Sequence, residues 1–321
     1  MQQSELDGKR VVIALGGNAL GDNPEEQLEL LKSTTKNLAE MIKEGINVII
    51  THGNGPQVGI IDEAFNIASA TKGSQVPSMP LVDCNAMSQG YIGAQLTCEL
   101  MNRVRELSIM RSVVDVPTHV VVDPDDPAFK DYDKPIGSFM TEAQAKEFAK
   151  KTGYKVAEDS GRGWRRVVPS PAPQDIVELE PMRDLMEDGC VVVGCGGAGV
   201  PVVLKNGQYE AVDVIVDKDL VSAMFAWKIK ADMLIILTAV EKVYINFDKP
   251  DQKPIDTMTT EEARTYIEQG QFAPGSMLPK VEACVKFVEA HPGGQALITS
   301  LGHAAEGLRG ETGTLITAVR S

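Results

Sequence analysis

Basic residues are in short supply in this sequence. Among its 321 residues, 31 are Lys or Arg and 45 are Asp or Glu, which gives a formal net charge of −14 at pH 7. Because proteins bind a duplex or an anionic membrane through clusters of Lys and Arg, this deficit argues against nucleic acid and membrane surfaces as partners. It does not exclude a small anionic substrate, because a few lysines can form a local positive pocket on an acidic surface.

Long apolar runs are also missing. No stretch reaches the roughly 18 consecutive apolar residues that a membrane-spanning helix needs. The charge-free run at 190–204 contains four glycines and a proline, and the apolar run at 11–15 is shorter than the core of a signal peptide. We therefore expect a cytoplasmic protein.

Cysteine and histidine are few and scattered. The five cysteines are odd in number and include no Cys-x-x-Cys pair, so the sequence indicates neither a disulfide framework nor a zinc ribbon. The four histidines include no pair at the spacing of metal ligands. We expect no metal site built from protein side chains. Cys195 lies beside a glycine-rich loop; we interpret it as an inert buried thiol, and the alternative is a thiol that reacts with electrophiles.

What the sequence does contain is an alternation of short apolar runs and amphipathic segments. Residues 24–44 carry apolar side chains at helical spacing, and Gly45 ends that pattern. Apolar runs typical of buried strands occupy residues 10–15, 46–51, 118–122, 190–193, 233–237 and 296–299. Buried strands separated by helices indicate an α/β protein whose mostly parallel sheet is covered on both faces.

One segment breaks this alternation. Residues 123–173 are rich in Pro, Asp, Lys and Arg. Within them, Thr141 and Gln144 have the spacing of a capping box at the start of a short helix. Residues 155–158 and 164–168 predict a small hairpin. We interpret the segment as a flap or subdomain that leaves the main sheet.

Two glycine-rich turns follow the first two predicted strands, Gly16-Gly17-Asn18 and Gly53-Asn54-Gly55. In an open parallel sheet the ligand lies at the carboxyl ends of the strands, where glycines let backbone N–H groups approach an oxyanion. The alternative is that Gly and Asn only make tight turns. Two such loops on successive strands favour anion binding.

A third loop, residues 194–199, has the pattern Gly-x-Gly-x-x-Gly. A dinucleotide-binding fold would need a helix after it, but an apolar run at 200–204 and the turn signal Asn206-Gly207 predict a hairpin instead. We therefore reject dinucleotide binding and keep the loop as a site of phosphate approach. No Walker A motif or nucleophile elbow occurs in the sequence.

Three lysines lie among these loops, Lys134, Lys218 and Lys280. Phosphoryl transfer needs positive charge around the moving group more than it needs a nucleophilic side chain. Each lysine taken singly is typical of a solvated surface, but Asp217 and Asp219 flank Lys218 and would hold it in place. These residues alone indicate an α/β protein that binds a nucleotide or a phosphate.

Seven motifs resemble those of the carbamate kinases, a branch of the amino-acid kinase superfamily. They are ALGGNAL at 14–20, HGNGPQVG at 52–59, AMSQG at 86–90, KPIG at 134–137, GRGWRRVVPSP at 161–171, VDKD at 216–219 and GSMLPK at 275–280. The similarity extends from about residue 9 to residue 317. Ala198 departs from the pattern, because carbamate kinases commonly have glycine there.

The resemblance implies a three-layer αβα sandwich on an eight-stranded sheet, with 123–173 as a protruding subdomain inserted in a single domain over 1–321. It also implies a homodimer. The implied reaction is reversible: carbamoyl phosphate and ADP give carbamate and ATP with Mg²⁺, to make ATP in the breakdown of arginine and carbamoyl phosphate. The alternatives are another small-acid kinase of the superfamily and a non-catalytic nucleotide sensor.

The resemblance also implies roles for individual residues. The residues implied to act in catalysis are Lys134, Lys218, Asp219 and Lys280, with Asp219 orienting the lysines. Those implied to bind carbamate and the phosphoryl group are Gly16, Gly17, Asn18, Gly53, Asn54 and Gly55. Those implied to bind the nucleotide are Gly196, Gly197, Asp217, Thr238, Val240, Tyr244 and Met277. His52 is assigned a polar role in its loop and no proton transfer.

Overall fold

An eight-stranded sheet forms the centre of the computed structural model, which describes residues 6–16, 20–21, 23–132, 134–159, 161 and 163–319. Its order is β15-β17-β16-β12-β1-β2-β9-β3. These strands are β1 (Arg10–Leu15), β2 (Asn47–His52), β3 (Val113–Val116), β9 (Val191–Gly194), β12 (Met233–Thr238), β15 (Thr257–Thr259), β16 (Gln295–Ser300) and β17 (Thr314–Thr317). Neighbouring strands are parallel except β16 and β17, which confirms the predicted mostly parallel sheet.

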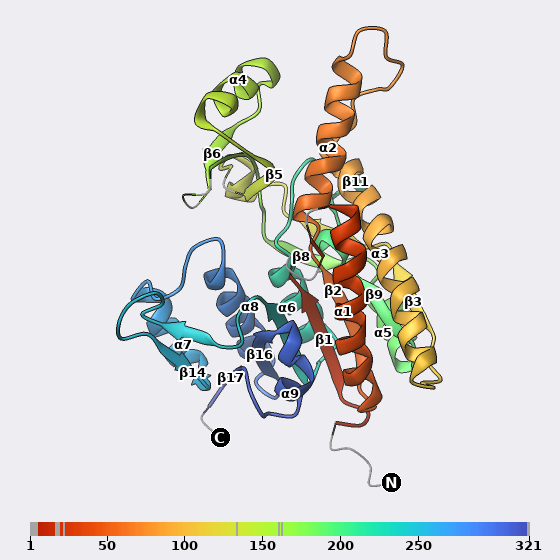
Figure 1. Ribbon diagram of the computed structural model, residues 1–321, viewed down its shortest axis with the longest axis vertical. Helices are drawn as coiled ribbons and strands as arrows, with labels where there is room; N and C mark the ends of the chain where they lie inside the picture. Colours follow the sequence, from red (N-terminus) through yellow and green to blue (C-terminus); the bar gives the residue numbers. More distant parts are fainter. Residues whose placement is uncertain are drawn as a thin grey trace.

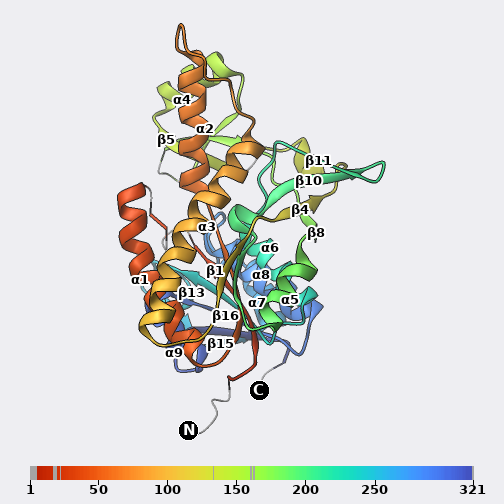
Figure 2. The same cartoon turned by 90° about the vertical axis from the view of Figure 1, so that its right-hand side faces the viewer.

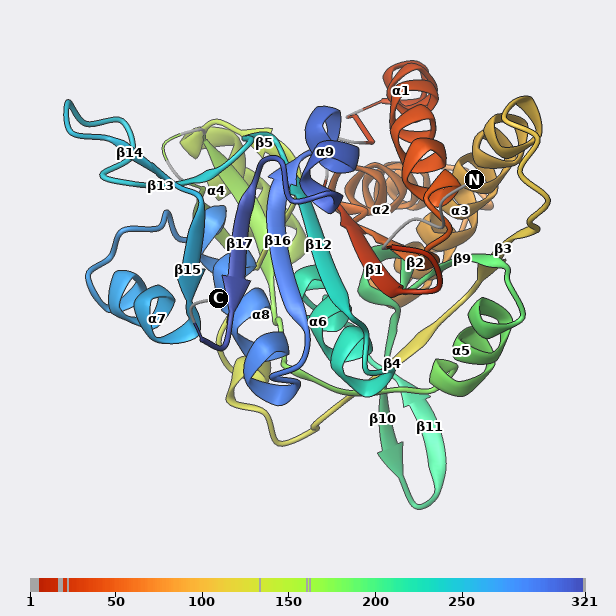
Figure 3. The same cartoon turned by 90° about the horizontal axis from the view of Figure 1, so that it is seen from below.

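Helices cover both faces of this sheet, as Figure 3 shows in a view along the layers. One face packs against α1 (Pro24–Lys43), α3 (Leu81–Glu106) and α9 (Ala304–Leu308). The other packs against α5 (Leu179–Glu187), α6 (Lys218–Lys228), α7 (Thr260–Glu268) and α8 (Met277–Ala290). The predicted three-layer αβα arrangement is therefore confirmed.

The central strand β1 separates the two hydrophobic cores. Its residues 11–15 are fully buried. Val12 and Ala14 belong to the core under α6 and α8, whereas Val11, Ile13 and Leu15 belong to the core under α1 and α3. Since successive side chains of a strand point to opposite faces, a continuous apolar run is what a strand buried on both faces requires.

The predicted strand at 118–122 exists, but it does not join the main sheet. It is β4 (His119–Val122), in a second sheet with β8 (Pro173–Ile176), β10 (Val200–Lys205) and β11 (Gln208–Ala211). The short strand β3, which the apolar pattern did not predict, takes the edge position of the main sheet, and Pro117 separates β3 from β4. Two further short strands, β13 (Val243–Ile245) and β14 (Lys253–Ile255), form a hairpin.

A small three-stranded sheet projects from the body beside α2 (Gly55–Ala70), as Figures 1 and 2 show. It contains β5 (Lys134–Met140), β6 (Val156–Glu158) and β7 (Trp164–Val168), with α4 (Glu142–Thr152) beside it. We call residues 134–168 the protruding subdomain. The capping box of Thr141 and Gln144 and the β6–β7 hairpin are confirmed, whereas the wider insertion 123–173 stays a prediction.

The third glycine-rich loop leads into a strand and not into a helix. Residues 196–198 form a short 3-10 turn, and β10 follows directly. β10 and β11 then form a hairpin around Asn206 and Gly207, as predicted. The helix that a dinucleotide-binding loop would open is therefore replaced by an antiparallel pair. Among the described residues, no helix is both long and apolar enough to cross a membrane.

Candidate active site

The carboxyl ends of β1, β2 and β12 meet at one edge of the sheet. Leu15, the last residue of β1, lies in register with His52 of β2 and with Leu237 of β12. The two glycine-rich turns therefore start side by side, and the Gly53 N–H donates to the Leu15 carbonyl at 3.2 Å. The predicted site residues Gly17 and Asn18 lie outside the described residues, so only Gly16 of the first turn is placed.

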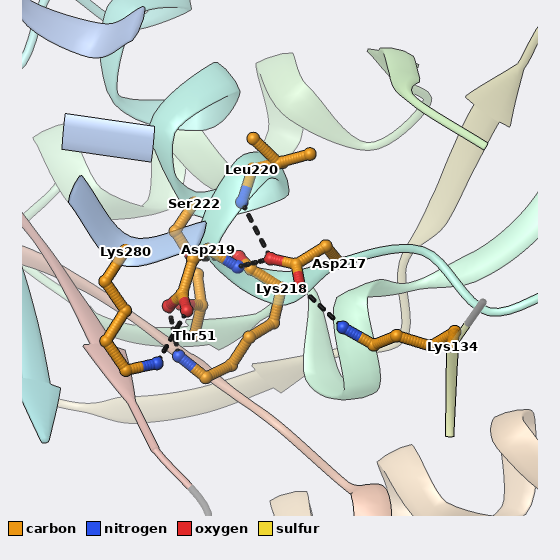
Figure 4. A network of polar contacts seen from close by, with 8 residues as sticks. All are labelled: Thr51, Lys134, Asp217, Lys218, Asp219, Leu220, Ser222 and Lys280. Carbon is orange, nitrogen blue, oxygen red and sulfur yellow. Dashed lines mark hydrogen bonds and ion pairs between the residues drawn. The ribbon is translucent and has the colours of Figure 1, made fainter. Parts of the chain in front are cut away.

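Two lysines from different helices share one carboxylate at this edge (Figure 4). Lys218, the first residue of α6, contacts Oδ1 of Asp219, and Lys280, in the first turn of α8, donates to Oδ2 of the same carboxylate at 2.9 Å. Asp219 therefore contacts both lysines, and its predicted role in orienting them for catalysis stays a prediction. Its contact with Lys280 brings together residues that are 61 positions apart in the sequence.

The third lysine reaches the site from the protruding subdomain. Lys134 begins β5, and its Nζ lies 2.5 Å from Oδ2 of Asp217. The other oxygen of Asp217 caps α6 by accepting the backbone N–H groups of Asp219 and Leu220 at 2.9 and 3.3 Å. Asp217 therefore serves both the start of α6 and the subdomain lysine, a pairing that the sequence did not predict.

The shared carboxylate is more buried than its two lysines. The Asp219 side chain is 4% exposed, against 14% for Lys218 and 17% for Lys280. Burial alone would raise the pKa of Asp219, but the charges of Lys218 and Lys280 outweigh it and hold that pKa below its ordinary value. Burial lowers the pKa of Lys218, helped by the nearby charge of Lys280 and opposed by Asp219.

The first turn of α6 is tied to β2 by two buried hydroxyl groups. The Oγ1 of Thr51 and the Oγ of Ser222 lie 2.7 Å apart, and Ser222 donates to the backbone carbonyl of Lys218 at 2.6 Å. Gly53 lies over the same turn, because a Cβ there would approach Cδ of Lys218 to 3.2 Å. The absence of a side chain at Gly53 thus lets the Lys218 stem pass the second loop.

Asn54 of the second loop is held by α3. Its Nδ2 donates to Oδ1 of Asn85 at 2.5 Å and to Oγ of Ser88 at 2.6 Å, and all three residues are buried. Asn85 in turn donates to the Gly199 carbonyl at 2.8 Å. Sequence reasoning missed Asn85 and Ser88, although Ser88 lies in the AMSQG motif and their spacing of three residues places them on one face of a helix.

Two positions of the third loop leave no room for a side chain, because this loop packs closely against the second glycine-rich loop. A Cβ on Gly197 would lie 2.2 Å from Nδ2 of Asn54, and one on Gly196 would lie 2.6 Å from Nε2 of His52. The predicted contact of both glycines with a nucleotide stays a prediction. Ala198 has φ +69°, a conformation that favours glycine, so the departure from the carbamate kinase pattern carries local backbone strain.

Two side chains that we excluded from the chemistry are buried. The Nδ1 of His52 lies 2.9 Å from the Gly53 carbonyl, and its buried Nε2 has no hydrogen-bond partner among the described residues. Burial lowers the pKa of His52 to about 4, so the ring is neutral near pH 7. Cys195 is fully buried and burial raises the pKa of its thiol, as expected for an inert cysteine.

The residues predicted to bind the nucleotide base lie on elements next to the lysines. Thr238 ends β12, Val240 follows it in a turn, and Tyr244 lies in β13. Met277 begins α8, which packs against β12 and carries Lys280 one turn further on. Thr238 and Val240 thus lie at the carboxyl end of β12 and Met277 at the start of α8, and the contact of all four residues with a nucleotide stays a prediction.

Residues 9–300 match the model of the amino acid kinase family. A carbamate kinase of Staphylococcus haemolyticus is 50% identical, with 96% of this chain and 99% of that protein covered. Carbamate kinase 3 of Staphylococcus aureus is 49% identical with the same coverage. The structure of the Giardia lamblia carbamate kinase bound to AMP-PNP has a TM-score of 0.87 and 37% identity, and covers 97% of this chain and 98% of that one. The chain therefore belongs to the amino acid kinase family and, within it, to the carbamate kinases.

Proposed function

We propose that this protein catalyses reversible transfer of a phosphoryl group from carbamoyl phosphate to ADP, which gives carbamate and ATP. The observation that carries the proposal is the arrangement of Lys134, Lys218 and Lys280 around two carboxylates at the carboxyl edge of the sheet. Three ammonium groups against two carboxylates leave one net positive charge. An anionic substrate would therefore find a local positive site within a chain of net charge −14.

The chemistry requires little more than position and charge. The bond between phosphorus and the carbamoyl oxygen breaks, and a bond between phosphorus and a β-phosphate oxygen of ADP forms. Carbamate leaves as an anion, so no general base is needed in this direction. Because the transition state spreads negative charge over the phosphoryl oxygens, Lys218 and Lys280 would stabilise it and Lys134 would approach from the subdomain. Asp219 would keep the first two in place.

The remaining contacts with the substrates are part of the same proposal. Gly16, Gly53, Asn54 and Gly55, with Gly17 and Asn18, would bind carbamate and the phosphoryl group. The nucleotide would lie toward Thr238, Val240, Tyr244 and Met277, with Asp217, Gly196 and Gly197 nearby. The relative solved with AMP-PNP, an ATP analogue, supports a nucleotide site of this kind.

Mg²⁺ would enter with the nucleotide. Among the described residues, no group of three His, Cys, Asp or Glu side chains is placed to hold a metal ion. Asp217 and Asp219, the acidic residues of this cluster, are paired with lysines. Phosphate oxygens and water, which Mg²⁺ prefers, would therefore supply most of its ligands, and the ion would neutralise part of the phosphate charge.

We also propose that the protein is a cytoplasmic homodimer that makes ATP during the breakdown of arginine or carbamoyl phosphate. The high identity to the staphylococcal carbamate kinases over nearly their whole length supports the reaction. The direction of the reaction, the dimer and the location rest on the family resemblance.

A coupled assay of ATP formation from carbamoyl phosphate and ADP tests the reaction. We expect turnover by the parent chain and a loss of at least about a hundredfold in kcat for Lys218→Ala, the scale of one lost transition-state contact. Lys228→Ala is the matched control, because Lys228 ends the same helix and pairs with Asp175 at 3.0 Å. Absence of turnover, or faster phosphorylation of acetylglutamate, aspartate or UMP than of carbamate in the reverse direction, would overturn the proposal.

A further inference from the structure

The protruding subdomain touches α2 at a point where two glycines meet. A Cβ on Gly59 of α2 would lie 2.3 Å from Cα and 2.8 Å from N of Gly137 in β5. These are backbone atoms, which cannot turn aside as a flexible side chain can. Any residue other than glycine at position 59 must therefore push β5 away from α2.

Two polar contacts between α2 and the subdomain lie on the same face of α2 as Gly59. Asp62 accepts from Nη1 of Arg166 in β7 at 2.7 Å, with side chains only 9% and 11% exposed. Glu63 accepts from Oγ of Ser138 at 3.1 Å. Positions 59, 62 and 63 of a helix share one face. We call Gly59, Asp62 and Glu63, with the subdomain residues they touch, the α2 seam.

The α2 seam acts together with a hydrophobic attachment. Val58 of α2, Ile136 of β5 and Val168 of β7 belong to one buried cluster that also joins α2 to the subdomain. A cavity of about 580 Å³ lies between α2 and the subdomain, and its lining includes the seam residues together with Ile67, Met140 and Phe148. Within this attachment, Gly59 is where the backbone of β5 leaves no room for a side chain on α2, so it limits how close the subdomain can stand to α2.

The strand that meets Gly59 is also the strand that carries Lys134. Lys134 precedes Gly137 by three residues in β5, about 10 Å along an extended chain. Arg165 holds the Gly137 carbonyl with an Nε hydrogen bond of 2.9 Å, and β5 pairs with β7 through Lys134 and Val168. A displacement of β5 at Gly137 would therefore move the base of the Lys134 side chain, whose tip lies 2.5 Å from Asp217.

We propose that Gly59 is a positioning residue: by admitting β5 to van der Waals distance of α2, it sets how far Lys134 reaches into the phosphoryl-transfer site. This inference rests on the proposed function only in that it takes Lys134 to contact the transferred group. Its geometric part, the placement of β5 by Gly59, stands without it.

The test combines kinetics with a readout that does not depend on activity. In the full chain, we expect Gly59→Ala to lower kcat about tenfold to a hundredfold, because misplacement by about 1 Å can have that effect. The KM for ADP should change less than twofold. Added to Lys134→Ala, the substitution should cause no further loss of kcat. Hydrogen exchange of the β5 amides should become faster.

Gly90→Ala is the matched control. Gly90 lies within α3, and a Cβ there would meet nothing within 4 Å. We expect parental kcat and parental β5 exchange in this variant. If Gly59→Ala fails to fold, Asp62→Asn replaces it, because it weakens the contact with Arg166 without a steric clash and should give the same pattern.

The outcomes separate the two proposals. An equal loss of kcat from Gly59→Ala with Lys134 present and with Lys134→Ala would overturn the positioning role, as would unchanged kcat and unchanged exchange in Gly59→Ala. A parent chain without turnover would overturn the proposed function. In that case the β5 exchange rates alone would still decide whether Gly59 places the strand.

Discussion

The buried carboxylate of Asp219 contacts two positively charged lysines. Removing a charged group from water is unfavourable unless partners compensate, and a carboxylate with an ammonium group on each oxygen is compensated twice. The same arrangement prepares both lysines for a phosphoryl group, since their ammonium groups are already held close together before substrate arrives. At the level of single residues, the site is thus organised around a carboxylate that itself makes no contact with substrate in our proposal.

His52 gives a prediction about stability and pH. Burial lowers its pKa from 6.5 to about 4. The unfolded chain therefore takes up a proton on this ring below pH 6.5, whereas the folded protein does so only near pH 4. The stability that the neutral ring contributes is complete above pH 6.5 and is lost as the pH falls toward 4, by up to about 3 kcal/mol. Urea unfolding at pH 7, 6 and 5 measures it.

His52→Asn isolates this contribution, because the amide retains an N–H donor for the Gly53 carbonyl and does not titrate. We expect its unfolding free energy to fall less than that of the parent between pH 7 and pH 5. Asp115, whose pKa burial raises to about 6, acts in the opposite sense but equally in both proteins. His303→Asn, at an exposed position, should keep the parental slope. A parental slope in His52→Asn would exclude His52 as the group responsible.

At the scale of elements, Asp217 has two roles that substitutions can separate. It caps α6, and it pairs with Lys134. Asp217→Asn retains a side-chain oxygen for the backbone N–H groups of Asp219 and Leu220 but loses the charge that faces Lys134. Asp217→Ala loses both. We expect the alanine variant to be about 1 kcal/mol less stable than the asparagine variant, the usual value of an N-cap side chain.

Thermal or urea unfolding of the two variants measures this difference. Asp126→Asn and Asp126→Ala serve as a second pair at a capping position. Asp126 caps the 3-10 turn at Pro127–Phe129 and also accepts the backbone N–H of Ala172 at 2.9 Å. Equal stability of Asp217→Asn and Asp217→Ala would mean that the cap contributes nothing to α6.

Local sequence patterns predicted the elements that are determined by residues close together in the sequence. The apolar run of β1, the capping box at Thr141 and the hairpin at Asn206 each depend on residues within a few positions, and each is confirmed. The assignment of β4 to the main sheet failed for the opposite reason. An apolar run indicates a buried strand, but which sheet it joins depends on β10, whose paired residues lie 81 positions further along the chain (His119 pairs with Val200).

The same limit applies to the site. Glycine-rich turns and lysines can be located from their neighbours in sequence, and the three lysines do converge. Their hydrogen-bond and ion-pair partners cannot be located in this way. Lys134 pairs with Asp217 across 83 positions, and Asn54 is held by Asn85 and Ser88 of α3. The sequence placed Asp217 and Asp219 together as flanks of Lys218. In the structure, Asp217 pairs with Lys134 and caps α6. The side chain of an N-cap residue turns toward the free backbone N–H groups of the first turn of its own helix.

At the scale of the whole molecule, both cores contain fully buried apolar side chains, but only the core under α6 and α8 supports the helices that carry Lys218 and Lys280. Phe225 of α6 and Leu38 of α1 are both fully buried, on opposite faces of the sheet. Truncation of either side chain to alanine should lower the free energy of unfolding by about 3–5 kcal/mol for Phe225 and about 2–5 kcal/mol for Leu38. Urea unfolding at 25 °C measures both.

Their effects on turnover should differ. α6 begins at Lys218 and packs against α8, which carries Lys280, so a cavity at Phe225 loosens the support of both lysines. α1 packs on α3 and α9, and Leu38 lies in its last two turns, away from the carboxyl edge of the sheet. Assayed where both variants are folded, Phe225→Ala should lose several-fold in kcat and Leu38→Ala less than twofold. Equal losses would mean that turnover depends on the stability of the molecule as a whole and not on the layer that supports the lysines.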